Sequence, residues 1–207
     1  MFRIVTISRE YGSGGGKVAE ELAKRLGWRL VDRSVVAEVA RRAQVDPSVV
    51  AHFDESSDPW FHHLVKALWR GGYEGVASRV EAEAIDSRTM AAVTGGIILE
   101  AAALGECIIV GRGGQCLLRQ RDDALHVSLF APREQKIAQL RERLAPRADI
   151  EECMEEADRR RAAYIRRTFG ADWKDHRLYH LMISSVLGLD TVAETILCAA
   201  GFAPQSS

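Results

Sequence analysis

Five arginines stand within nine residues in the stretch ADRRRAAYIRRTFG. Guanidinium groups bind phosphate oxygens through paired hydrogen bonds, and phosphoryl transfer needs positive charge around the transferring group more than covalent catalysis. On a helix, residues seven apart share a face, so the pairs Arg159/Arg166 and Arg160/Arg167 are candidate catalytic residues. The alternative is a solvated helix whose arginines pair with the glutamates nearer its start.

The N-terminal stretch SREYGSGGGKVAEELAKRLG is typical of a phosphate-binding loop that leads into a helix. The pattern G-x-x-x-x-G-K-[ST] fits it poorly, because Tyr11 replaces the first glycine and Val18 replaces the hydroxyl residue. Counting from the last apolar residue of the strand instead places Gly15 where the lysine belongs. Lys17 then lies two residues, or about 200°, away from the phosphate side of the helix.

Backbone N–H groups remain as the phosphate ligands of this loop. We expect Arg9 to supply part of the missing lysine's charge, and the alternative for Arg9 is a surface ion pair with Glu10. A glycine-rich turn without a ligand is the alternative for the loop as a whole. The candidate cofactor-binding residues of the loop are Arg9, Gly12, Ser13, Gly14, Gly15, Gly16 and Lys17.

Three further candidates for substrate binding follow predicted strands. Arg112, in VGRGG, is assigned to an acceptor phosphate, against the alternative of a structural ion pair. Asp32 and Arg33 end the second predicted strand. Asp32 could bind an acceptor group or a magnesium-bound water, or it could cap the next helix.

The elements that must position these residues form an α/β fold. Short apolar runs predict strands near residues 3–7, 29–31, 107–110, 125–130 and 181–185. They alternate with amphipathic helices, which predicts one parallel sheet with helices on both faces and ligands at the carboxyl ends of the strands.

The predicted organisation is a single domain over residues 1–207. Its core comprises 1–34, 104–145 and 176–203, a helical insert spans about 35–103, and a charged segment spans about 146–175. Trp173, in that last segment, is expected to pack in the core or against that charged segment rather than stack on a base.

Composition favours a protein of the cytoplasm. The formal net charge is −1, so no global charge attracts nucleic acid or membrane. No apolar run is long enough for a signal peptide or a membrane span. The four cysteines lack C-x-x-C spacing, and no metal-ligand cluster is visible, so we expect no protein-held metal site.

The chain resembles the cytidylate kinase-like family of P-loop nucleoside monophosphate kinases. The resemblance rests on ISREYGSGGGKVAEELAKRLGW with LVDRSVV, on CIIVGRGGQCLL, on LHVSLFAPREQKIAQL and on ADRRRAAYIRRTFGADWKDHRLYHLMISS. It implies a donor nucleotide at the glycine loop, an acceptor-binding helical insert and an arginine-rich lid. Ser184, Ser185 and His180 depart from the family's usual residues at the donor side.

The leading hypothesis is therefore a kinase that transfers the γ-phosphate of ATP, with Mg²⁺, to CMP or a related acceptor. One alternative is a nucleotide-binding P-loop module with weak or no kinase activity. Another is a kinase-fold enzyme acting on a different small molecule. The expected partners are small-molecule nucleotides, without nucleic acid or membrane.

Overall fold

The computed structural model describes residues 1–32, 34–35, 87–142 and 149–202. The chain divides into two compact units: residues 1–30 and 106–207 form the first, and residues 31–105 form the second. Arg33 and most of the predicted helical insert lie outside the described residues. The boundaries of the predicted core, insert and lid remain a prediction.

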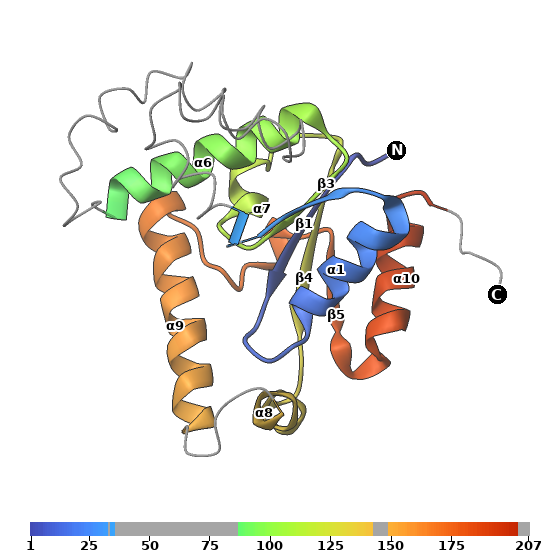
Figure 1. The fold of residues 1–207 in the computed structure, drawn as a ribbon. Helices are drawn as coiled ribbons and strands as arrows, with labels where there is room; N and C mark the ends of the chain where they lie inside the picture. Colours follow the sequence, from blue (N-terminus) through green and yellow to red (C-terminus); the bar gives the residue numbers. More distant parts are fainter. Residues whose placement is uncertain (33, 36–86, 143–148, 203–207) are drawn as a thin grey trace, which may run out of the picture. The chain divides into compact units, whose positions relative to one another are not determined.

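A five-stranded sheet organises the fold, and its strand order is β2-β3-β1-β4-β5 (Figure 1). The strand β1 pairs in parallel with β3 and β4, and β4 pairs in parallel with β5. The predicted α/β class with one parallel sheet is confirmed. The strands are β1 (Ile4–Arg9), β2 (Arg29–Val31), β3 (Cys107–Val110), β4 (Ala124–Phe130) and β5 (Leu181–Ser184).

The central strand β1 runs two residues beyond the predicted end at Ile7. Ser8 and Arg9 are polar, which favoured a loop from the sequence alone, yet both continue the ladder with β4. Parallel pairing with β4 supplies hydrogen bonds that a local pattern does not reveal. As a result, Ser8 and Arg9 are held on the sheet rather than on a loose segment.

One face of the sheet is apolar and is covered by α1 (Gly15–Leu26) and α10 (Leu189–Ala199), which lie side by side in Figure 1. The helix α1 ends at Leu26, because Gly27 takes a left-handed C-cap conformation with φ of 66°. Burial of each aliphatic side chain in such a core contributes about 1.5–3 kcal/mol. The helices bury Val18, Ala19, Leu22, Val192, Ala193, Ile196 and Leu197 against this face.

The other face of the sheet is polar near its centre. Thr6 Oγ1 lies 2.8 Å from His126 Nδ1, and the backbone N–H of His126 donates to His180 Nδ1 at 2.9 Å. The two imidazole rings stack with centroids 5.0 Å apart. Burial, followed by the nearby His180, lowers the pKa of His126 to about 4. His126 is therefore neutral at physiological pH.

Two helices follow β4. The helix α8 (Arg133–Arg141) begins after Pro132, which is its N-cap residue. The longer α9 (Ile150–Phe169) begins at Asp149, whose carboxylate accepts a hydrogen bond from Glu152 N at 3.0 Å. The short helix α7 (Gly114–Leu117) and the 3-10 turns η1 (His176–Leu178) and η2 (Ser185–Leu187) were not predicted, because they are too short to show periodicity.

The described part of the second unit contains α6 (Ser87–Leu104). Its buried positions recur at the three- and four-residue spacing of one helix face, which agrees with the helix predicted from this region. They are Thr94, Ile97, Ile98, Ala101 and Ala102. None of the helices in the described ranges is long and apolar enough to span a membrane.

Candidate functional site

The glycine loop connects β1 to α1 and ends in an open helix N-terminus. Gly14 is the N-cap, with φ of 79°, and no side chain caps the helix. The first turn consists of Gly15, Gly16 and Lys17 and contains no acidic residue. The first N–H groups of a helix have no intrahelical acceptor, and the helix dipole favours an anion there. This end of α1 is therefore suited to bind phosphate.

The side chain of Arg9 packs against Gly15. A Cβ atom at position 15 would lie 2.7 Å from Arg9 Cβ and 2.8 Å from Arg9 Cγ. No side chain fits at position 15 unless Arg9 moves. Position 15, where the register places the phosphate lysine of other loops, therefore requires glycine in this chain. The guanidinium of Arg9 continues to Gly111, against which its Nη1 atom lies. Arg9 thus places a positive charge between the glycine loop and the end of β3.

The rest of the loop is held by backbone contacts and by α8. Ser13 is buried, and its hydroxyl donates to Glu10 O at 2.9 Å. Gly12 has a φ of 86°, and a Cβ there would lie 3.0 Å from Lys136 O. Lys136 Nζ, in turn, donates to Glu10 Oε2 at 2.9 Å. The loop is therefore built to keep one shape, with Glu10 paired to α8.

Lys17 lies on the solvent side of α1. Its side chain is exposed, whereas Val18, the next residue, is buried in the core. This placement agrees with the register in which Lys17 is not the phosphate lysine, although its contact with a ligand stays a prediction.

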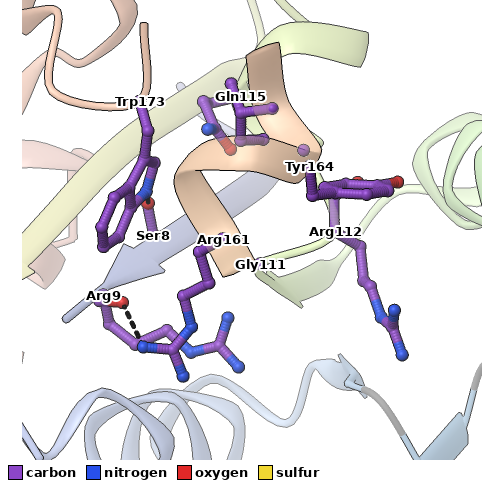
Figure 2. Close-up of a pocket in the computed structure, with 10 residues that line it drawn as sticks. Ser8, Arg9, Gly111, Arg112, Gln115, Arg161, Tyr164 and Trp173 are labelled. Atoms are coloured by element: carbon purple, nitrogen blue, oxygen red, sulfur yellow. Dashed lines mark hydrogen bonds between the residues drawn. The ribbon is translucent and has the colours of Figure 1, made fainter. Parts of the chain in front are cut away.

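A pocket lies at the carboxyl end of the sheet, beyond β1 and β3 (Figure 2). Its volume of about 40 Å³ exceeds the ~10–15 Å³ that one water needs. Arg9, Arg112 and Arg161 are among its lining residues, and no acidic side chain is among the lining residues that the structure describes. The pocket thus suits a small anion. The lining side chains include Ser8, Arg9, Arg112, Arg161, Tyr164 and Trp173.

Arg112 sits on a strained turn. Its φ is 55°, a left-handed conformation that costs a non-glycine residue roughly 1–2 kcal/mol. The hydroxyl of Tyr164 donates to Arg112 O at 3.5 Å, and the ring of Phe169 lies against the neighbouring Gly113. Burial raises the pKa of the Tyr164 phenol. The turn is thus held by the C-terminal half of α9, and strain of this kind is often found at binding sites.

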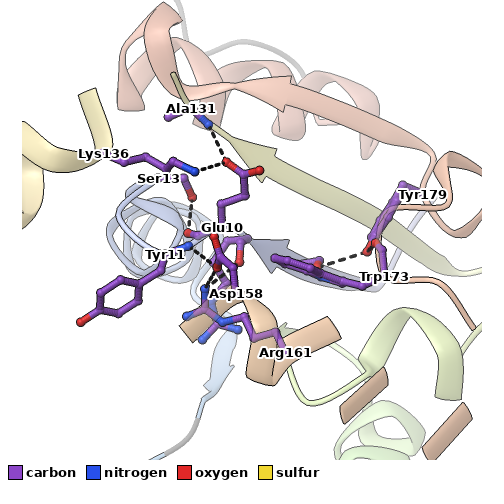
Figure 3. Close-up of polar contacts among 11 residues, drawn as sticks. Glu10, Tyr11, Ser13, Ala131, Lys136, Asp158, Arg161, Trp173 and Tyr179 are labelled. Atoms are coloured by element: carbon purple, nitrogen blue, oxygen red, sulfur yellow. Dashed lines mark hydrogen bonds and ion pairs between the residues drawn. The ribbon is translucent and has the colours of Figure 1, made fainter. Parts of the chain in front are cut away.

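The helix α9 contacts the glycine loop through one acid and one base (Figure 3). The backbone N–H of Tyr11 donates to Asp158 Oδ1 at 2.8 Å. Arg161 Nη1 donates to the same oxygen at 2.7 Å and to Arg9 O at 3.2 Å. Burial raises the pKa of the Asp158 carboxyl, while the Tyr11 N–H and Arg161 act in the opposite direction. These contacts orient Arg161 into the pocket.

The four arginines predicted to be catalytic lie on the exposed surface of α9. Arg159 and Arg160 both pair with Glu156, and their side chains are 69% and 77% exposed. Arg166 and Arg167 are also exposed. None of the four lines the pocket. Their catalytic role stays a prediction, and the structure brings Arg161 to the pocket in their place.

Asp32 makes the contacts expected of a helix cap. Its Oδ1 atom accepts hydrogen bonds from Ser34 N at 2.8 Å and from Val35 N at 3.1 Å. Of the two roles left open for Asp32, capping is the one visible here, and ligand binding stays a prediction. Arg33 lies outside the described residues.

Sequence reasoning missed Arg161 and Trp173 as pocket residues. Arg161 belongs to the same arginine run as the predicted set, so the run itself was the correct signal. The signal that distinguishes it is Asp158 three residues earlier, since the two side chains form an i, i+3 pair. Trp173 carries no local signal of this kind.

Comparisons with known proteins identify a matching family. The model of the cytidylate kinase-like family matches residues 4–186. A cytidylate kinase of Shewanella sediminis is 32% identical over 89 residues, a match that covers 42% of this chain and 39% of that protein. The chain therefore spans about two fifths of the length of the curated relative that it matches.

Solved structures share the fold at low sequence identity. An uncharacterized protein from Eubacterium ventriosum has a TM-score of 0.68 at 20% identity, covering 96% of this chain and 98% of that one. A shikimate kinase from Acinetobacter baumannii in complex with shikimate has a TM-score of 0.51 at 15% identity, covering 96% and 93%. These likenesses show a kinase-like fold.

Proposed function

Because the chain belongs to the cytidylate kinase-like family, we propose that it is an ATP-dependent nucleoside monophosphate kinase, with CMP or a related nucleotide as acceptor. The observation that carries the proposal is the pocket lined by Arg9, Arg112 and Arg161 beside the glycine loop. Phosphoryl transfer depends on positioning and on positive charge around the transferring group. The three arginines at the carboxyl end of the sheet supply this positive charge.

The donor phosphates are assigned to the glycine loop. Gly14 and Gly15 bring backbone N–H groups to the start of α1, and Arg9 adds the charge that a loop lysine would otherwise supply. Ser13 and Gly12 hold the loop in shape. Gly16 and Lys17 complete the first turn, with Lys17 outside the phosphate contacts.

The acceptor phosphate is assigned to Arg112. Its strained backbone keeps the residue at the pocket, and a planar guanidinium binds a phosphate through two parallel hydrogen bonds. Asp32 and Arg33 are proposed to contribute on the acceptor side. Arg161 is proposed to contact the group in transfer, with the exposed arginines of α9 as a second set that would act if the helix turns on binding.

Magnesium enters this proposal together with ATP. Among residues 1–32, 34–35, 87–142 and 149–202, no group of three or more His, Cys, Asp or Glu side chains could hold a metal ion. Mg²⁺ typically keeps several waters and binds substrate phosphates together with few protein ligands. We therefore assign it no residue of its own, and we propose the cytoplasm as the place of the reaction.

The alternatives differ from the main proposal in turnover and in acceptor. The glycine at position 15 and Val18, which has no oxygen for a metal, favour a nucleotide-binding module with weak activity. The fold shared with a shikimate kinase favours an enzyme acting on another small molecule. In both alternatives the glycine loop still binds a nucleotide, but the arginine pocket has a different role.

Release of ADP across CMP, dCMP, UMP, AMP and GMP tests the proposal, with shikimate as a compound outside the nucleotides. We expect turnover with at least one pyrimidine monophosphate. Gly14→Val is the control, because a branched side chain at a φ of 79° would obstruct the loop. ATP binding without turnover on any monophosphate would favour the binding module, and turnover on shikimate alone would favour the second alternative.

Loss of Arg112 separates the two substrates. Arg112→Ala should raise the Michaelis constant of the acceptor by about 10- to 100-fold, which corresponds to ~1.5–3 kcal/mol for a charge-assisted hydrogen bond. The donor constant should hardly change, and Arg112→Lys should rescue only in part. If the donor constant rises instead, Arg112 belongs to the donor side.

A further inference from the structure

Buried polar side chains form a network beneath the arginine pocket, between β1 and the segment after α9. Trp173 Nε1 donates to Ser8 Oγ at 2.7 Å. The Tyr179 hydroxyl donates to Trp173 O at 2.7 Å and lies 3.3 Å from Ser8 Oγ. Gln115 Nε2 donates to the Tyr179 hydroxyl at 3.5 Å. The four residues are between 2% and 9% exposed, so the network is buried.

The network does more than fill space. Buried polar groups are costly unless paired, and an apolar cluster of the same volume would stabilise the fold at least as well. Hydrogen bonds differ from apolar contacts in that they fix direction. Ser8, Gln115 and Trp173 all line the pocket, whereas Tyr179 supports them from behind. The indole ring is thereby held in one orientation at the pocket wall (Figure 2).

Trp173 also connects the end of α9 to β1. It lies three residues beyond Gly170, the C-cap of α9. The middle of the same helix is tied to the glycine loop by Asp158 and Arg161. The helix is therefore attached to the end of β1 at two levels, and the position of Arg161 depends on both attachments.

We propose that Trp173 is a positioning residue for the arginine pocket: anchored by Ser8, it fixes the C-terminal end of α9 and so places Arg161 for a phosphate-bearing ligand. The inference rests on the proposed function in one respect, that the pocket binds phosphate. Trp173 itself transfers no proton and makes no covalent bond. Its effect passes through Arg161.

Pyrophosphate binding to the full chain tests this inference without any turnover. Titration calorimetry would compare wild type with Trp173→Phe, which keeps a ring but removes the N–H, with Ser8→Ala and with the double variant. Binding that is lost in Arg161→Ala counts as pocket binding. Each single variant should weaken pyrophosphate binding about fivefold. The double variant should bind no more weakly than the single variants, because both substitutions remove the same Trp173–Ser8 hydrogen bond.

The indole N–H resonance gives a second readout that a purely structural role would not move. The indole N–H resonance that is present in the wild-type spectrum and absent from that of Trp173→Phe is assigned to Trp173. Pyrophosphate should shift this signal in wild type, and Arg161→Ala should abolish the shift. Trp28→Phe is the matched control, since that indole packs edge-to-face on Phe202, with centroids 5.6 Å apart, away from the pocket. It should leave pyrophosphate affinity within about twofold.

The outcomes distinguish this inference from the proposed function. If Trp173→Phe and Ser8→Ala lower the melting temperature but keep pyrophosphate affinity, the network is only structural and the inference is wrong. If wild type does not bind pyrophosphate through Arg161, the inference is also wrong. If the affinities change as expected and no nucleoside monophosphate is phosphorylated, the inference holds and the proposed function fails. Should Trp173→Phe not fold, Ser8→Ala alone decides, because it removes a single hydroxyl.

Discussion

The two faces of the sheet are built from alternate residues of the same strands, yet their side chains differ in polarity near the centre of the sheet. On one face, Val5 and Ile7 of β1 stand beside Leu125 and Val127 of β4, and α1 and α10 cover them. On the other face, polar residues of the same two strands stand in register: Thr6 beside His126 and Ser8 beside Ser128.

The difference shows how one strand serves two purposes. Side chains alternate between the two faces of a strand. The strand β1 can therefore place apolar side chains on one face of the sheet and polar side chains on the other. The apolar row stabilises the fold through burial. The polar row makes hydrogen bonds to distant segments, as Ser8 does with Trp173. Stability and positioning are therefore separable by mutation.

The largest effect on stability should come from the apolar face. Ile7→Ala should lower the free energy of unfolding by about 3–4 kcal/mol, because it opens a cavity in a close-packed core. Thr6→Val, on the other face, keeps the volume and loses one hydrogen bond, at a cost of about 1 kcal/mol. Urea denaturation measures both. Equal losses would show that the two faces do not differ in this way.

The next effect concerns activity. Arg161→Ala should lower the turnover number about a hundredfold, or ~2.7 kcal/mol, because its guanidinium is held in the pocket. Arg160→Ala should change turnover less than about threefold, since that side chain is exposed beside Glu156. Initial rates of ADP release at saturating substrates would measure both. A larger loss for Arg160 would indicate that α9 turns when substrates bind.

Acid should destabilise the protein through the polar face. The imidazole of His126 binds a proton near pH 6.5 in the unfolded chain, whereas in the fold its pKa is lowered to about 4. The unfolded state thus binds more protons between these values, and stability falls as pH drops from about 6.5 towards 4, by about 2–3 kcal/mol.

Urea unfolding at several pH values would follow this loss. His126→Gln should flatten the pH dependence, while His176→Gln, at an exposed position, should leave it unchanged. If the dependence survives in His126→Gln, another group causes it.

The smallest effect should come from Lys17. This side chain lies on the outer side of α1, opposite the row that packs on the apolar face. Lys17→Ala should keep ATP affinity within about threefold, under ~0.7 kcal/mol. Fluorescence titration with an ATP analogue measures it. A tenfold loss would restore the register in which Lys17 contacts phosphate.

Local features of the fold were predictable because their causes are local. Val18 and Leu22 are buried at the spacing of one helix face, and Gly27 ends the helix where the apolar pattern stops. Apolar runs located all five strands, although the end of β1 was placed two residues early. A helix N-terminus at the glycine loop was also predicted, and α1 begins inside the glycine run, since glycine accommodates the N-cap conformation of Gly14.

Which arginine enters the pocket was not predictable from the arginine run. The helix α9 is charged on nearly every side, so its sequence has no apolar row to show which side packs. Neighbouring residues on a helix point about 100° apart. Arg160 therefore reaches solvent and Arg161 the pocket, and the contact of Asp158 with Tyr11, 147 residues earlier, is part of what selects the side.

The sequence alone determined the strands, the helices around them, the glycine-rich loop before α1 and the concentration of arginines in α9, because each depends on residues that are close together in the chain. Tertiary structure decided how these parts meet. Ser8 and Trp173 are 165 residues apart, and Thr6 and His126 are 120 apart. Hydrogen bonds over such separations depend on strand order and register, which no local pattern encodes, so the pocket's wall and its third arginine emerge only once the chain has folded.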